Sequence, residues 1–154
     1  MRVDEAYRHW LFHGPCFQGI SEIEGINEQG ISAILLPSSP DRCLSQNVGG
    51  QWLIDPVLLD CGFQLAILWE RSHHDMTPLP SRFKSYRRFG PLRGSPVRCY
   101  LKAQSSAGGQ NLLTDIYFLD SAGRLVSLLE EMEFSCSSAL NRLSSVAASS
   151  QGGR

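Results

Sequence analysis

The sequence has no long hydrophobic run. Nowhere do apolar residues continue for the roughly 18 positions that a membrane-spanning helix needs. The start of the chain also lacks the basic residues followed by an apolar core that mark a secretory signal. We therefore expect a cytoplasmic protein without a membrane partner.

An excess of either charge is also missing. The chain carries 14 Lys and Arg against 15 Asp and Glu, a formal net charge of -1. Because nucleic-acid-binding domains usually show an excess of positive charge, the composition predicts no nucleic-acid partner. At 154 residues the chain is long enough for one domain with a sizeable core.

Paired cysteines are absent as well. The five cysteines are odd in number, widely spaced and free of any CxxC pair, which argues against a disulfide framework and against a zinc site. They are expected to be free thiols, with Cys61 packing in a core. His73 and His74 have no cysteine or carboxylate at ligand spacing, so they predict a solvated loop and no metal.

The strongest positive signal is a helix over 55–69. Asp55 can cap the first turn and Pro56 suits the first helical position. Apolar residues then continue around all sides, as in a helix surrounded by protein. Asp60 and Gln64 interrupt them on one face, one turn apart. A carboxyl left unpaired in an apolar site keeps its proton at neutral pH, as a general acid must, although a buried carboxyl is more often simply hydrogen-bonded.

The remaining pattern predicts an α+β fold. Residues 3–11 have the spacing of a short amphipathic helix, 38–51 form a loop, and small residues dominate the segment 137–154, which predicts a disordered tail or linker. Alternating and apolar segments predict strands at 16–26, 31–36, 82–89, 97–103, 112–119 and 124–135. One long helix with meandering strands fits a hotdog domain over 1–136, in which a curled antiparallel sheet wraps the helix.

Four motifs together resemble a known family. They are LFHGPCFQGI at 11–20, DPVLLD at 55–60 with Gln64, Leu79-Pro80, and DSAGR at 120–124. In order and spacing this set is similar to the second hotdog of the dehydratase domain of polyketide synthases and multifunctional fatty-acid synthases. The likeness extends to about Ser135.

The resemblance implies a reaction and a site. Members of the family remove water from β-hydroxyacyl thioesters presented on the phosphopantetheine arm of an acyl carrier protein, without a further cofactor. Asp60 then matches the catalytic aspartate and Gln64 the polar residue that holds it. The implied substrate-binding residues are His13, Gly14, Pro15 and Phe17. The implied partners are the carrier protein, other synthase domains and a second hotdog, and we expect self-association.

The chain departs from the family pattern at two places. His13 stands where the family usually has tyrosine, and Asp55 where it usually has histidine. More important, the catalytic histidine of the family lies in an HxxxGxxxxP motif, and none of the four histidines here begins one. The sequence therefore predicts an incomplete dyad, with the base supplied from elsewhere. His13 could serve as that base, or it could be a hydrogen-bonding residue of a turn.

Other interpretations stay open at this point. The chain could be a non-catalytic docking or dimerisation module, or a hotdog that catalyses isomerisation, cyclisation or thioester hydrolysis. The basic run formed by Arg82, Lys84, Arg87 and Arg88 could attract an acidic carrier protein, or it could be a solvated strand face.

Overall fold

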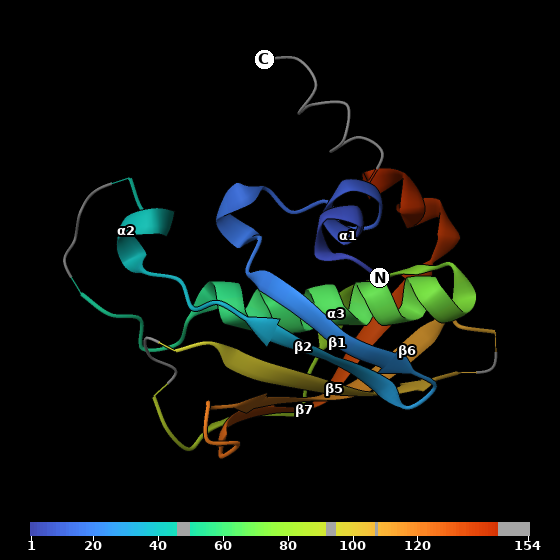
Figure 1. Ribbon diagram of the computed structural model, residues 1–154. Helices are drawn as coiled ribbons and strands as arrows, with labels where there is room; N and C mark the ends of the chain where they lie inside the picture. Colours follow the sequence, from blue (N-terminus) through green and yellow to red (C-terminus); the bar gives the residue numbers. More distant parts are fainter. Residues whose placement is uncertain (46–49, 92–94, 107, 145–154) are drawn as a thin grey trace, which may run out of the picture.

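A single curled sheet surrounds one long helix. The computed structural model describes residues 1–45, 50–91, 95–106 and 108–144 (Figure 1). Seven antiparallel strands run in the order β1-β2-β5-β6-β7-β3, with β4 also paired to β7, around helix α3 (Pro56–His74). The strands are β1 Ile20–Asn27, β2 Gly30–Leu35, β3 Thr77–Arg82, β4 Ser85–Arg88, β5 Val97–Ser105, β6 Asn111–Leu119 and β7 Leu125–Ser137. This confirms the predicted α+β hotdog fold.

Helix α3 begins where the sequence predicts. The Asp55 carboxylate accepts hydrogen bonds from the backbone N–H groups of Val57 and Leu58, at 2.9 and 3.2 Å, and Pro56 occupies the first helical position. Asp55 also accepts from the backbone and the hydroxyl of Ser38. Because four donors satisfy this buried carboxylate, it fixes both the helix start and the segment that follows β2.

The sheet curls because β7 is bent in its middle. Glu131 has a φ of 46°, and the pairing register with β6 shifts beside it, between Thr114 and Ile116. The Asp115 side chain accepts the backbone N–H of Glu131 at 3.0 Å. On one side of this bulge β7 pairs with β4 and on the other with β3, so one long strand reaches around the helix.

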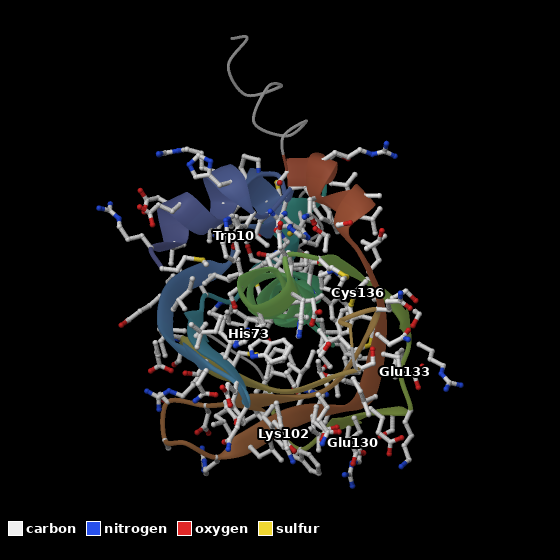
Figure 2. All side chains as sticks on the ribbon, turned by 90° about the vertical axis from the view of Figure 1, so that its right-hand side faces the viewer. Trp10, His73, Lys102, Glu130, Glu133 and Cys136 are labelled. Carbon is white, nitrogen blue, oxygen red and sulfur yellow. The ribbon has the colours of Figure 1, made fainter. Side chains whose placement is uncertain are left out.

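Short segments close the open side of the curl. Figure 2 shows the sheet around α3, with α1 (Val3–His9) and the C-terminal η2 (Ser138–Asn141) on the side that the sheet leaves open. The Arg71 guanidinium lies over the Trp10 ring, 5.6 Å from its centroid, and ties α1 to α3. The amphipathic helix expected over 3–11 is therefore present as α1, and its apolar residues Val3, Ala6 and Tyr7 pack against the core.

Three segments differ from the sequence prediction. The strand expected from residue 16 starts only at Ile20, because Pro15–Phe17 form a 3-10 turn, η1. The loop expected over 38–51 contains the short helix α2 (Pro40–Cys43), while its residues 46–49 lie outside the described residues. The histidine pair lies in the last turn of α3 rather than in a loop, because the helix continues to Asp75, whose left-handed conformation ends it.

The single strand expected over 82–89 corresponds to the last residue of β3 and to the whole of β4. β3 already begins at Thr77 and includes Pro78 and Pro80, and β4 follows after a short break. Prolines are tolerated in β3 because it lies at the edge of the sheet and pairs only with β7. The sequence predicted no strand over 77–81.

The C-terminal segment begins as ordered chain. Ser137 is the last residue of β7, and in η2 Asn141 accepts from the Thr77 hydroxyl and donates to the Asp75 carbonyl, both at 2.8 Å. Ordered structure therefore extends beyond the predicted domain end at 136. The rest of the expected tail, 145–154, lies outside the described residues.

All five cysteines are free, in agreement with the sequence prediction. Within the described ranges, no helix combines the length and the apolar character needed to cross a membrane.

Candidate active site

A chain of polar contacts crosses the face of α3 that carries Asp60. Gln64, one turn further along, donates from Nε2 to Asp60 Oδ2 at 2.7 Å and to the Phe17 carbonyl at 2.8 Å. Its Oε1 accepts from the Tyr7 hydroxyl at 2.9 Å. Gln64 is fully buried. With both ends of its amide bonded, it holds Asp60 in one orientation.

Tyr7 connects this site to α1 and β1. Its hydroxyl donates to Gln64 and accepts the backbone N–H of Ile20 at 3.1 Å. Burial raises the pKa of Tyr7, with a smaller contribution from the neighbouring Cys61, so the hydroxyl keeps its proton. The sequence placed Tyr7 only within the amphipathic helix expected over 3–11. Its hydroxyl contact with a residue 57 positions away had no local signal.

His13 approaches the same carboxylate from the turn after α1. Its Nε2 lies 3.4 Å from Asp60 Oδ2, and its ring stacks on Phe12 with centroids 4.6 Å apart. Burial lowers the pKa of His13, and the Asp60 charge partly opposes this shift. The structure thus brings together a histidine and an aspartate that are 47 positions apart in the sequence.

Asp60 is less buried than the sequence suggested. Its side chain is 26% exposed, and its neighbours Leu59 and Phe63 are also only partly buried. The prediction that α3 is enclosed on all sides is wrong for this face, because the sheet wraps the other faces and leaves this one to the η1 turn. Asp60 is consequently both held by Gln64 and reachable by solvent.

The three other predicted substrate-binding residues lie in η1 or beside it. Gly14 precedes η1, Pro15 begins it and Phe17 ends it, and all three are exposed. The backbone carbonyl of Phe17 accepts a hydrogen bond from Gln64, and 37% of the residue is exposed to solvent. The turn reaches α3 because residue 19 is glycine, where a Cβ would lie 2.8 Å from Cys61 Sγ. Burial raises the pKa of this Cys61 thiol to about 12.

A groove of about 930 Å³ runs between α1 and β1 and reaches this site. Tyr7, His13, Gln18 and Ile20 lie along it, together with polar residues of α1 and β1 toward its outer end. His13 lines this groove with a side chain that is only 12% exposed, and Asp60 is not among the lining residues.

Two other groups of residues singled out in the sequence lie away from this site. His74 Nδ1 pairs with Glu70 at 2.9 Å, and the His73 ring stacks on Trp69 with centroids 4.4 Å apart. Across the part of the chain that the structure describes, no group of three or more His, Cys, Asp or Glu side chains could hold a metal ion.

The basic run lies along β3 and β4, where glutamates of β7 pair with three of its four members. Arg82 contacts Glu133 at 2.8 Å and Arg87 contacts Glu130 at 2.6 Å, while Lys84 pairs with Glu131. Figure 2 shows Glu130 and Glu133 on the outside of the curled sheet. Paired charges of this kind favour the solvated strand face over an attracting surface for a carrier protein.

Solved structures with the same fold include dehydratase domains and an enoyl-isomerase of polyketide synthases. The dehydratase domain from the CurJ module of the curacin synthase matches with a TM-score of 0.72 at 18% identity, over 89% of this chain and 50% of that one. The dehydratase domain of PpsC from Mycobacterium tuberculosis, in complex with C12:1-CoA, matches with a TM-score of 0.69 at 20% identity, over 89% and 52%. A trans-acyltransferase polyketide synthase enoyl-isomerase matches with a TM-score of 0.63 at 14% identity, over 79% and 46%.

These likenesses show the fold, and the chain spans about half the length of each of these structures. Among curated proteins, no sequence matches this chain.

The family model for the polyketide synthase dehydratase N-terminal domain matches residues 2–144. Its description names the N-terminal domain, so the predicted placement as the second hotdog is not confirmed. The match covers almost the whole chain, which therefore belongs to the polyketide synthase dehydratase family.

Proposed function

We propose that this chain takes part in the dehydration of β-hydroxyacyl thioesters to enoyl thioesters, with Asp60 as the acid. The observation that carries the proposal is the Asp60 carboxylate, which Gln64 holds at 2.7 Å on a partly exposed face, next to the imidazole of His13. A carboxyl that only stabilised the core would not need a buried amide with three contacts to orient it toward solvent.

The contacts of Asp60 assign different tasks to its two oxygens. Oδ2 accepts from Gln64 and faces His13, whereas no donor among the described residues contacts Oδ1. Loss of water requires an acid because hydroxide is a poor leaving group. Oδ1 is the atom that can carry the proton to the substrate hydroxyl while Gln64 keeps the carboxyl in place.

The substrate class follows from the family and from one of the similar structures. PpsC binds an acyl thioester, C12:1-CoA, in the structure that resembles this chain. By extension, the substrate here is an acyl chain on the phosphopantetheine arm of a carrier protein. No further cofactor is required, because acid and base suffice for this elimination.

We place the chain as the second hotdog of a dehydratase, working with a first hotdog and with other synthase domains. Asp60 and Gln64 support this placement, since the family resemblance assigns this pair to the second hotdog. Two further observations agree with this placement. The sequence contains no HxxxGxxxxP motif, and the chain covers about half of each similar structure.

Asp60→Asn tests the proposal. Dehydration of 3-hydroxybutyryl-pantetheine is measured by mass spectrometry, with the chain alone and with the chain fused behind a hotdog that carries an HxxxGxxxxP histidine. Asn cannot deliver a proton, so activity should fall by roughly 10²- to 10⁴-fold. Asp41→Asn is the control, because Asp41 is exposed and lies outside the site.

The same substitution separates catalysis from structure. Asn can still accept the Gln64 hydrogen bond, and the side chain is partly exposed, so unfolding free energy should change by less than about 1 kcal/mol. Retained dehydration in Asp60→Asn would remove Asp60 from the reaction. Loss of activity together with a loss of stability well above this limit would favour a structural role.

Double-bond isomerisation is the second candidate. It moves one proton along an enoyl chain without a leaving group, and an enoyl-isomerase is among the structures with this fold. A β,γ-enoyl pantetheine thioester distinguishes the two reactions. Conversion of this compound, without dehydration of the 3-hydroxyacyl compound, would favour the isomerase.

A further inference from the structure

We infer that the outer face of the sheet carries a groove that binds a proline-rich segment with an acidic residue at one end. The groove has a volume of about 620 Å³ and crosses β1, β2, β5 and β6. It lies outside the curled sheet, whereas Asp60 and Gln64 belong to α3 on the inside. The inference therefore goes beyond the proposed reaction and does not depend on it.

The strand alternation brings one row of side chains to this face. Burial alternates strictly along β5, so Arg98, Tyr100 and Lys102 point away from α3. In the strand register Tyr100 lies between Ser32 of β2 and Tyr117 of β6. Figure 2 shows Lys102 on the outside of the sheet, away from α3. Three strands thus contribute to one outward-facing surface.

Two tyrosine rings form the apolar part of the groove. The ring centroids of Tyr100 and Tyr117 lie 6.1 Å apart with their planes tilted by 34°, and 37% of Tyr100 is exposed. Beside them the strands carry small residues, because Gly25 of β1 pairs with Ser32. A Cβ at Gly25 would meet no atom within 4 Å. The surface is recessed here, and the tyrosine rings are open to a ligand.

The groove also offers hydrogen-bond donors that the fold does not use. The hydroxyl groups of Ser32, Tyr100 and Tyr117 have no hydrogen-bond partner among the described residues. Partial burial raises the pKa of Tyr117, with a smaller contribution from the Asp115 charge, so this hydroxyl keeps its proton. Because β2 and β5 are paired on both sides, a ligand is recognised by these side chains and not by the backbone.

The two ends of the groove differ in charge. At one end Arg98 is held by Glu24, at 2.8 to 3.0 Å. At the other end Lys102 has no ion-pair partner within the described part of the chain. Its register partner Asp115 accepts the backbone N–H of Glu131 instead. The Lys102 end is therefore complementary to a carboxylate of a ligand.

A polyproline II segment has the chemistry that these groups require. It makes no internal hydrogen bonds and proline has no N–H, so its carbonyls are free to accept and it brings no competing donors. Its rings pack well on aromatic side chains, which is how aromatic-lined grooves recognise proline-rich segments. The tyrosine rings, the unused hydroxyls and the Lys102 ammonium together fit such a segment when it carries a carboxylate at one end.

Fluorescence polarisation with a labelled peptide, Pro-Pro-Pro-Leu-Pro-Pro-Pro-Glu, tests the groove. Binding to the purified chain should be saturable. Tyr100→Ala should weaken it by about 10-fold or more, because an exposed ring is lost from the centre of the contact. Tyr100→Phe keeps the ring and loses only the hydroxyl, so it should weaken binding by about three- to ten-fold.

Phe83→Ala is the control for this test, since Phe83 is exposed at 55% and lies between β3 and β4, outside the groove. Circular dichroism checks that each variant is folded. Binding that does not saturate, or equal losses in Phe83→Ala and Tyr100→Ala, would overturn the inference.

The position of the carboxylate is tested with a double-mutant cycle. Lys102→Gln, or glutamine in place of the glutamate of the peptide, should each weaken binding by about two- to five-fold. Both changes together should cost no more than one of them, because they remove the same contact. Lys84→Gln is the control, since Lys84 pairs with Glu131 on another part of the sheet. Losses that add would contradict the contact with Lys102.

Two further measurements separate this ligand from other occupants. A peptide with the same charge and glycine at every proline should bind at least about 10-fold more weakly, because it lacks the rings and the fixed backbone. Equal binding would make the groove a site for anions and overturn the inference. NMR signals of Tyr100 and Tyr117 that shift with chain concentration, without peptide, would show that a second copy covers the groove and would also overturn it.

Discussion

At the scale of single residues, the site depends on groups that sequence patterns could not connect. The i, i+4 spacing of Asp60 and Gln64 predicted that they share a helix face, and the structure joins them at 2.7 Å. The spacing could not reveal that Tyr7 and the Phe17 carbonyl hold Gln64, because those contacts span 57 and 47 positions. Nor could it show that the face of α3 that carries Asp60 is partly open.

Tyr7→Phe tests how much the site depends on this support. The change leaves the buried Gln64 Oε1 and the Ile20 N–H without their partner, so unfolding free energy should fall by about 1 to 3 kcal/mol. Urea denaturation measures the loss. Tyr86→Phe is a matched control, because the Tyr86 hydroxyl is buried with no hydrogen-bond partner among the described residues. Equal effects of the two substitutions would contradict the special role of Tyr7.

At the scale of elements, local sequence signals predicted where a helix starts and where the chain turns. They predicted less well how long each element is and which other elements it contacts. Asp55 and Pro56 defined the first turn of α3, since capping acts within a few residues. The helix continues beyond Trp69 because its polar last turn is fixed by contacts with distant segments, such as the β5 residue Ser105. Likewise, the bulge at Glu131 depends on Asp115 of another strand, so the sequence predicted the strand but not its bend.

Glu70 makes the last turn of α3 sensitive to pH. Its side chain is fully buried, with His74 at 2.9 Å and the Ser105 hydroxyl at 3.4 Å, while His73 and Cys136 lie within electrostatic range. Burial raises the pKa of Glu70 above its ordinary value of 4.5, although His74 and Ser105 oppose the shift. The folded chain therefore holds this proton more tightly than the unfolded chain, and the associated stability is lost as pH rises from about 4.5 through the folded pKa.

Glu70→Gln should remove this dependence. Gln has no proton to lose and can still accept from His74, so its unfolding free energy relative to native chain should increase as pH rises from 4 toward 8. Urea denaturation at several pH values measures the difference, with the exposed Glu28→Gln as the control. A constant difference between native chain and Glu70→Gln across this range would contradict the raised pKa.

At the scale of the whole molecule, the exposed surface indicates where a partner can bind. Both edges of the sheet resist strand pairing: β1 has two register shifts and carries Glu22 and Glu24, and β3 contains two prolines. Exposed apolar side chains instead gather on the segments that flank the start of α3, next to the site. We call these residues the apolar rim: Phe17, Leu36, Leu44, Leu53 and Ile54.

We expect a second copy of the chain to bind through the apolar rim. Leu53 is 75% exposed and Leu36 47%, and an apolar group of this kind is costly to leave in water. The similar structures are about twice as long as this chain, so their additional half could cover the surface that a second copy would cover here. A two-fold pair would bury the rim of each copy against the other and exclude water from the neighbourhood of Asp60.

Light scattering over a range of concentrations tests this expectation. Leu53→Glu should shift the chain toward monomer without a loss of folding, because the side chain is exposed and the new charge would be buried only in the pair. Phe83→Glu is the control, since Phe83 is also exposed, at 55%, but lies between β3 and β4 and outside the rim. A native chain that stays monomeric at high concentration would refute the pairing, and equal dissociation by both substitutions would place the contact elsewhere.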